Sequence, residues 1–204
     1  MGVRSRAAAA ILSEAGLKEV YSMKGGINAW EGRVAEGVPE AGMAYFSTAI
    51  QPEELVGLAW LLEDGSRKFY VEMASMSKDR EAIALFQELS KAEERHQASL
   101  IHLYKELSGR PFDSEFPGNL VREDPSHERI EGGMLLREAV QWAEKKAVKE
   151  ILEFSISLES NAYDLYLKME RKMETENAKK VFRVVSTEEK THLEQLASLL
   201  EKKL

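Results

Sequence analysis

Cysteine is absent from this sequence of 204 residues. Its absence excludes disulfide bonds, thiolate-ligated zinc, iron–sulfur centres and thiol catalysis within the chain. Any metal ion that binds here must therefore be held by carboxylate and imidazole side chains.

An excess of basic charge and long apolar runs are also lacking. The formal net charge is -7, whereas a nucleic-acid partner requires a basic protein surface. No apolar run approaches the length of a membrane span. The first ten residues, MGVRSRAAAA, do not contain the apolar region of a secretory signal. We therefore expect a cytoplasmic protein without a membrane or nucleic-acid partner.

Proline is scarce, and three of the five prolines fall between residues 108 and 131. This stretch is predicted to be a long crossover loop. On both sides of it, apolar residues recur at helical spacing. The pattern predicts long helices from residue 52 to beyond 73 and at 80–107, 148–172 and 177–203, with a short helix at 132–145. Four long helices with one long connection predict a mainly α, ferritin-like four-helix bundle over residues 43–204.

An internal repeat appears, without gaps, when the sequence is shifted against itself by 96 residues. Twelve identities fall between positions 54 and 103, where ordinary composition gives about three. The identical pairs are Glu54 and Glu150, Leu62 and Leu158, Glu63 and Glu159, Tyr70 and Tyr166, Met73 and Met169, Ala82 and Ala178, Phe86 and Phe182, Ser90 and Ser186, Glu93 and Glu189, His96 and His192, Leu100 and Leu196, and Leu103 and Leu199. The repeat predicts a bundle with approximate two-fold symmetry.

Each half supplies one Glu from its first helix and a Glu-x-x-His pair from its second. Residues three positions apart project from one face of a helix, so each pair can bind a cation. Four carboxylates and two imidazoles form the ligand set of a carboxylate-bridged dinuclear metal site. The candidate ligands are Glu63, Glu93, His96, Glu159, Glu189 and His192. Four carboxylates balance two divalent cations, and the donor set suits iron or manganese, with zinc as a further option.

Tyr70 and Tyr166 stand at equivalent positions beyond the two single glutamates. We interpret them as hydrogen-bond donors that orient a metal-bound carboxylate, and packing alone is the alternative. A lone Glu-x-x-His is usually part of a solvated helix face, so a metal-free bundle also remains open. The duplicated pattern favours the metal site. His102 and His127 lack paired partners and are expected at the surface.

Four stretches, LLEDGSRKFYVEMA, LSKAEERHQASL, SLESNAYDLYLKM and VSTEEKTHLEQL, resemble the metal-bearing helices of rubrerythrins, a branch of the ferritin-like superfamily. The resemblance covers roughly residues 50–204. It implies a non-haem di-iron site with the six ligands named above, and reaction with peroxide or dioxygen, or iron oxidation.

The chain departs from that family in two respects. Besides the di-iron site, rubrerythrins carry a separate iron ligated by cysteines, which delivers electrons. This chain has no cysteine, so electrons would come from another protein. The family also places a further Glu three residues after the third-helix Glu, where this chain has Ala162.

The first 42 residues resemble the last third of a rhodanese domain, through GVRSRAAAAILSEAG, EVYSMKGGINAW and GVP. In that family the nucleophilic cysteine precedes the first of these stretches, at a position before Met1 here. We expect a truncated α/β rhodanese-like segment at residues 1–42. Without a thiolate, it is not expected to transfer sulfur.

Three functions follow from this sequence. The first is a di-iron oxidoreductase of the rubrerythrin type, acting on peroxide or dioxygen with electrons from an external donor protein. The second is an iron-binding or storage module, and the third is an interaction module without turnover. We expect a homodimer, because the long connection permits helix exchange between protomers.

Overall fold

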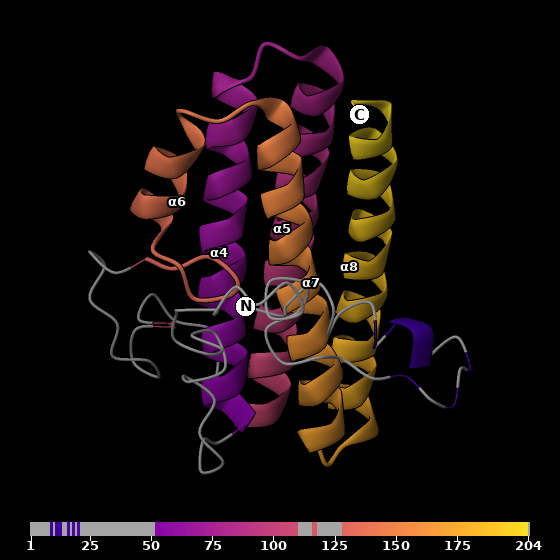
Figure 1. Cartoon of the computed structure of the whole chain (residues 1–204). Coiled ribbons are helices and arrows are strands. Elements are labelled where there is room, and N and C mark those ends of the chain that lie inside the picture. Colours follow the sequence, from indigo (N-terminus) through magenta and orange to yellow (C-terminus); the bar gives the residue numbers. More distant parts are fainter. Residues whose placement is uncertain are drawn as a thin grey trace, which may run out of the picture.

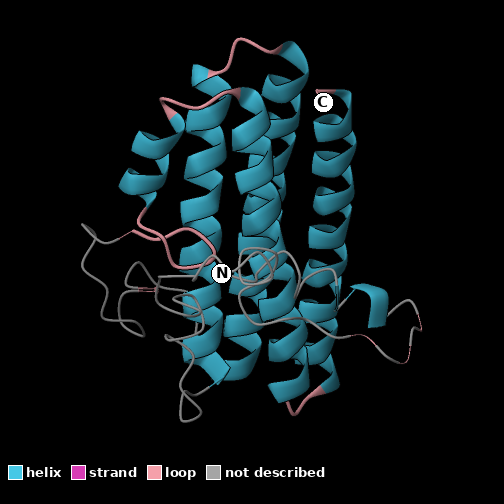
Figure 2. Cartoon of the chain, in the orientation of Figure 1, coloured by secondary structure: helices cyan, strands magenta, loops and turns pink. Residues whose placement is uncertain are grey.

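The computed structural model of the chain describes residues 52–109, 116–117 and 128–203, with a few positions near the N-terminus (9, 11–13, 16, 18 and 20). Helices dominate (Figure 2), and the described residues contain no strand; Arg129 and Leu135 form an isolated bridge. The predicted rhodanese-like segment, residues 1–42, lies almost entirely outside the described residues. Residues 9 and 11–13 within it are helical.

Four long helices form the body of the described structure, as the sequence predicts, and a short helix precedes the third of them. Their bounds are α4 Pro52–Met76, α5 Arg80–Ser108, α6 Leu136–Ala143, α7 Val148–Lys172 and α8 Glu176–Lys202. The prediction of a mainly helical bundle is therefore confirmed.

Local side-chain chemistry sets the helix ends. The Asp79 carboxylate accepts hydrogen bonds from the backbone N–H groups of Glu81 and Ala82, each at 3.1 Å, and so caps the N-terminus of α5. The predicted start of the short helix at residue 132 is too early. Gly132 and Gly133 have φ angles of 81° and 84°, a conformation that makes a turn and not a helix, so α6 begins at Leu136.

The helices pair as two hairpins, α4 with α5 and α7 with α8. Figure 1 shows the four long helices side by side, with α6 against the outside of α4. Helices α5 and α7 begin at the same end of the bundle and run in the same direction. At one end of the bundle, the Lys203 ammonium lies 2.7 Å from the carboxylate of Asp79 and 2.9 Å from that of Glu81, which ties the end of α8 to the start of α5.

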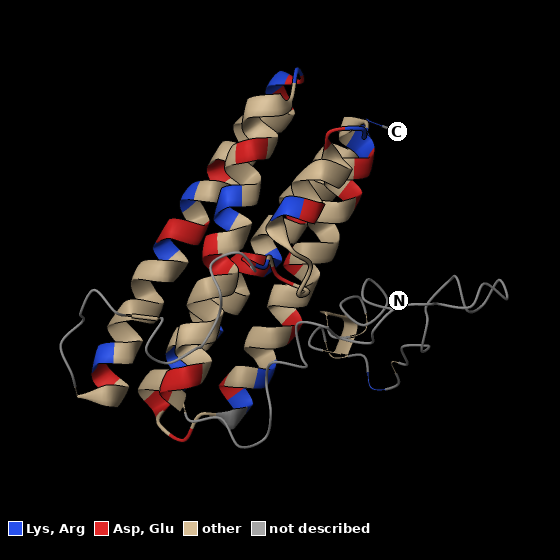
Figure 3. Cartoon of the chain, turned by 90° about the vertical axis from the view of Figure 1, so that its left-hand side faces the viewer, with Lys and Arg blue, Asp and Glu red and all other residues tan. Residues whose placement is uncertain are grey.

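The apolar core is divided into two parts. One part contains Leu58, Leu103, Tyr166 and Phe182 and lies toward the start of α4. The other contains Phe69, Phe86, Leu152 and Leu196 and lies toward the opposite end. Between the two parts, buried glutamates and histidines occupy the middle of the helices, and Figure 3 shows acidic segments gathered at this level. Such a layer of charge inside a core needs compensating partners.

No described helix combines the length and the apolar character of a membrane span.

Candidate metal centre

The six candidate ligands from the sequence are brought together in the polar layer. Their oxygen and nitrogen atoms form two groups, each with all atoms within 4.8 Å of one another. The first group contains Glu63, Glu93, His96 and Glu189, and the second contains Glu93, Glu159, Glu189 and His192. Glu93 and Glu189 belong to both groups, so they lie between the two positions where a cation could bind. None of the six is more than 5% exposed.

The helical period explains this convergence. Leu89 and Leu100 are buried above and below the first pair on α5, so Glu93 and His96 continue the inward-facing stripe of that helix. The equivalent stripe on α8 carries Glu189 and His192. Because α5 and α8 lie beside each other, the two imidazole rings meet with centroids 5.6 Å apart.

The Nδ1 atom of His96 lies close to three carboxylate oxygens. The distances are 3.2 Å to Glu63 Oε2, 3.0 Å to Glu93 Oε2 and 3.1 Å to Glu189 Oε1. A single proton on this nitrogen can be shared well with only one of these oxygens. The arrangement matches a cation that accepts one nitrogen and several oxygens at once.

The second half repeats part of this arrangement. Nδ1 of His192 lies 3.1 Å from Glu159 Oε2 and 3.2 Å from Glu189 Oε2. Residues His192 and Glu159 are the copies of His96 and Glu63 in the internal repeat, so the two-fold symmetry expected from the sequence extends to the contacts.

Several buried oxygens of the centre have no hydrogen-bond partner among the described residues. They are both carboxylate oxygens of Glu93 and Oε1 of Glu189. Two of them are close to His96 Nδ1, but the geometry is not that of a hydrogen bond. Buried polar atoms are rarely left unsatisfied in proteins, and metal coordination would satisfy these. The residues present therefore fit a pair of cations.

Electrostatics at the centre are dominated by crowding of like charges. Burial raises the pKa of Glu93 well above its usual value, and the charges of Glu63 and Glu189 raise it further. Burial also raises the pKa of Glu159. In contrast, the pKa of Glu189 is lowered because His96 and His192 outweigh the effect of its burial.

Both imidazoles are held in the charged form by these carboxylates. Burial alone would lower the pKa of His192, but hydrogen bonds with Glu159 and Glu189 raise it to about 11. The pKa of His96 is likewise raised well above its usual value, because the charges of Glu63 and Glu189 outweigh burial. Without a metal ion, protons compensate the carboxylates, and a binding cation must displace them.

The two tyrosines cross between the halves. The Tyr70 hydroxyl on α4 donates a hydrogen bond to Glu159 on α7, and the Tyr166 hydroxyl on α7 donates to Glu63 on α4. Each ring also stacks on a phenylalanine, Tyr70 on Phe86 at 6.0 Å and Tyr166 on Phe182 at 6.0 Å. The tyrosines thus both pack in the core and hydrogen-bond to a carboxylate. The bond reaches the glutamate of the opposite half, a detail that the sequence did not specify.

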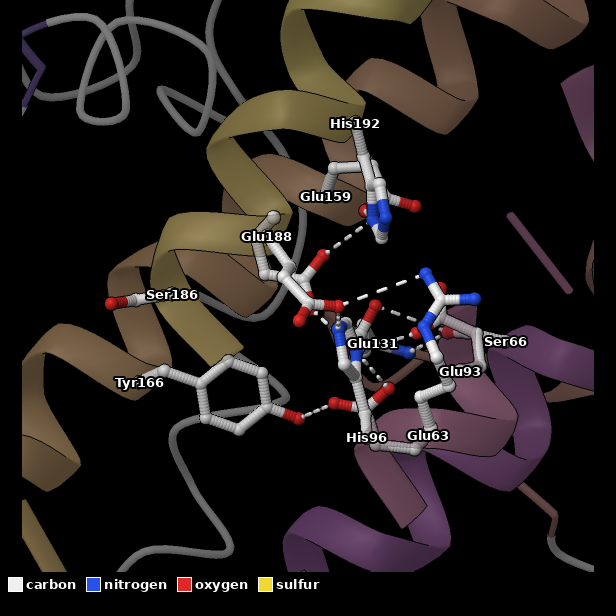
Figure 4. Close-up of polar contacts among 12 residues, drawn as sticks. Glu63, Ser66, Glu93, His96, Glu131, Glu159, Tyr166, Ser186, Glu188 and His192 are labelled. Carbon is white, nitrogen blue, oxygen red and sulfur yellow. Dashed lines mark hydrogen bonds and ion pairs between the residues drawn. The ribbon is translucent and has the colours of Figure 1, made fainter. Parts of the chain in front are cut away.

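Two acidic residues near the centre were missed by the sequence analysis. Glu188 on α8 lies 3.0 Å from Nε2 of His96. When a metal ion displaces the Nδ1 proton, the Nε2–H group can still donate to Glu188 and hold Nδ1 toward the other carboxylates, as in many histidine metal ligands. The only sequence feature that could have indicated Glu188 is its position next to Glu189. Adjacent acidic residues are common on helices, so this feature did not distinguish it. Figure 4 shows both Glu188 and Glu131 close to His96.

Glu131, the second missed residue, belongs to the chain that links α5 and α6. Its side chain is only 1% exposed. No periodic pattern could have indicated it, because it lies in a turn. Among the remaining histidines, His102 is exposed as predicted, and His127 lies outside the described residues. Ala162, at the position of the further Glu of rubrerythrins, is fully buried, and its side chain has no atom that could bind a metal.

Known proteins provide an independent comparison. The rubrerythrin family model matches residues 150–203. This match spans α7 and α8 and therefore includes Glu159, Tyr166, Glu189 and His192. It covers the second copy of the internal repeat, and it supports a rubrerythrin-like, ferritin-like helical domain with a carboxylate–histidine centre.

A solved structure from Pyrococcus furiosus, described as "Hypothetical Protein Pfu-1136390-001", is also similar. The two chains align with 26% sequence identity and a TM-score of 0.59. The alignment covers 81% of this chain and 95% of the Pyrococcus chain. No curated protein matches the chain.

Proposed function

We propose that the chain is a non-haem di-iron protein of the rubrerythrin type that reduces peroxide or dioxygen. The observation that carries this proposal is the meeting of three carboxylate oxygens at Nδ1 of His96, within 3.2 Å. The proposed ligands are Glu63, Glu93, His96, Glu159, Glu189 and His192, with Glu93 and Glu189 shared between the two ions. Manganese or zinc suits the same donors.

Iron bound at this centre would supply electrons for cleavage of an O–O bond, because it cycles between two oxidation states. Reduction of hydrogen peroxide consumes two electrons and two protons and yields two water molecules. The chain has no cysteine to hold a separate electron-delivering iron beside the di-iron centre, so we propose that an external electron donor protein supplies the electrons.

The protein's own residues hold the proposed ligands in position through hydrogen bonds. Tyr70 and Tyr166 hold Glu159 and Glu63 in place through their hydroxyl groups. Burial and the charges of neighbouring carboxylates raise the pKa values of both tyrosines well above the usual value, so the hydroxyls remain protonated donors. Glu188 orients His96 through Nε2.

Turnover is the direct test of the enzyme proposal. Protein loaded with ferrous iron under nitrogen should consume hydrogen peroxide in the presence of a reductant, with two electrons taken from the reductant per peroxide. A variant with Glu93→Ala and Glu189→Ala should not. Oxidation of the iron by peroxide in a single turnover, without continued consumption, would instead favour iron binding or storage.

The interaction-module alternative predicts a different result. Addition of ferrous iron and air should produce a new ultraviolet–visible absorption band if the centre binds and oxidises iron, and no band if the bundle is metal-free. Size-exclusion chromatography separates the proposed homodimer from a large, ferritin-like shell.

The N-terminal 42 residues are proposed to be a rhodanese-like segment separate from the bundle, which spans 43–204. This proposal rests on the sequence resemblance alone. No sulfurtransferase activity is expected from the chain, because it contains no thiol.

A further inference from the structure

The crossover between α5 and α6 ends in a tight turn that spans residues 129–135. The Ile130 N–H donates to the Met134 carbonyl at 3.0 Å, and the Gly133 N–H donates to the Ile130 carbonyl at 2.9 Å. The Arg129 guanidinium donates to the Gly133 carbonyl at 2.7 Å. These bonds fix the backbone on both sides of Glu131, which lies within the turn.

Two glycines allow this turn to fit between α4 and α7. A Cβ atom at Gly65 on α4 would lie 2.0 Å from the Arg129 carbonyl oxygen, so only glycine permits this contact. A Cβ atom at Gly132 would lie 2.4 Å from Nδ2 of Asn161 on α7. The turn is therefore closely fitted to one helix from each half of the bundle.

The fitted turn carries the Glu131 side chain into the polar layer. Its backbone N–H donates to Oγ of Ser66 at 3.3 Å, and the Ser66 hydroxyl donates to Glu131 Oε2 at 3.2 Å. The other oxygen, Oε1, is buried and has no hydrogen-bond partner among the described residues. Figure 4 shows this carboxylate among Glu93, His96 and Ser66.

The surroundings of Glu131 are those of the centre itself. Burial raises its pKa well above the usual value, and the charges of Glu63, Glu189 and Glu159 raise it further. Glu131 in turn contributes to the raised pKa values of both Tyr70 and Tyr166. It therefore lies within electrostatic range of both halves, although its position in the sequence is between the two copies of the repeat.

We propose that Glu131 is a fifth carboxylate ligand of the metal centre, delivered by the crossover and held in position by Ser66. The proposal rests on the metal centre proposed above. A turn that needed only to be anchored to Ser66 would be served by an uncharged side chain, because burial of a fifth carboxylate beside four others is costly without a cation. Coordination gives Oε1 the partner that it otherwise lacks.

Metal binding by Glu131→Gln tests the proposal. The control is Glu128→Gln, because Glu128 is exposed near the same turn and pairs with Lys68 at 2.6 Å. Manganese affinity would be measured by competition with a chelator on the full chain. We expect Glu131→Gln to lose at least about tenfold in affinity for one ion, and Glu128→Gln to bind as the wild type does.

Thermal unfolding separates coordination from a purely structural role. Glu131→Gln replaces an acidic group whose burial beside other carboxylates is costly, so the metal-free variant should unfold at or above the wild-type temperature, while the manganese-loaded variant should unfold below the manganese-loaded wild type. A structural hydrogen bond alone would shift both forms in the same direction. Equal destabilisation of both forms, or failure of the metal-free variant to fold, would overturn the proposal.

A charge-preserving variant gives a second readout. Glu131→Asp keeps the carboxylate but shortens its reach, so the absorption spectrum of the cobalt(II)-loaded protein should change, whereas that of Glu128→Asp should not. Unchanged affinity and spectra, with two ions bound by the wild type, would overturn only the role of Glu131. If the wild type bound no metal, the proposed centre would fail as well.

Discussion

The hydroxyl of Tyr70 in α4 donates its hydrogen bond to Glu159 in α7, so the first half of the chain orients a carboxylate of the second half. Tyr166 does the same in reverse, through Glu63. The two bonds connect the α4–α5 and α7–α8 hairpins at the level of the centre. They make the position of each single glutamate depend on the docking of the two halves.

Replacement of either tyrosine by phenylalanine should weaken metal binding by a similar factor. The variant keeps the aromatic packing on Phe86 or Phe182 but removes the hydroxyl donor, and loss of such an orienting partner costs about 10- to 100-fold in affinity. Chelator competition measures the effect. A large loss for Tyr70→Phe and none for Tyr166→Phe would contradict the symmetric role of the two residues.

Glu188 should matter for one half of the centre only. It bonds to Nε2 of His96 at 3.0 Å, while the equivalent position in the first half is Ala92. We expect Glu188→Ala to lower the affinity for the ion bound by His96 by about tenfold or more. The affinity for the ion bound by His192 should be nearly unchanged. A stepwise manganese titration resolves the two. Equal weakening of both steps would show that Glu188 does not act through His96.

The metal-free protein should lose stability as pH rises from about 5 to 9. Burial raises the pKa of Glu159 above its ordinary value of 4.5, so its charge imposes a growing penalty as pH rises above that value. The pKa of His192 is raised from 6.5 to about 11. Its stabilising effect is complete below pH 6.5 and is lost as pH rises toward the folded-state value.

Urea unfolding of chelator-treated protein at several pH values checks this prediction. Metal-loaded protein serves as the contrast. Because metal binding displaces protons from the ligands, the affinity of the protein for metal should increase from pH 5 to 9. Metal-free protein that gained stability between pH 5 and 9 would show that the buried cluster does not hold the charges described here.

Gly65→Ala should destabilise the fold, although alanine is normally the better helix residue. In a helix interior this change usually stabilises by about 0.5–1 kcal/mol. Here the new Cβ would lie 2.0 Å from the Arg129 carbonyl oxygen, so we expect a loss of about 1–3 kcal/mol from overpacking. Denaturant unfolding measures the change in the free energy of unfolding between Gly65→Ala and the wild type. A variant more stable than the wild type would contradict the close contact between α4 and the turn.

Much of the candidate site could be predicted because its residues lie on regular helices. Glu93 and His96 share a face through helical spacing, and the repeat assigns the same geometry to Glu189 and His192. Glu131 could not be predicted, since the position of a turn depends on contacts far away in sequence, such as Gly65. The tyrosine partners were likewise undetermined, because they depend on how α4 packs against α7.

The metal content of the protein is the most direct test of the central claim. Protein grown with iron, or loaded with ferrous iron under nitrogen and desalted, should contain two iron ions per chain, and the Glu93→Ala, Glu189→Ala variant should contain none. A matched variant with Glu94→Ala and Glu194→Ala removes two exposed glutamates from the same helices and should retain two. Two ions per chain in the first variant, or none in the wild type, would contradict the account.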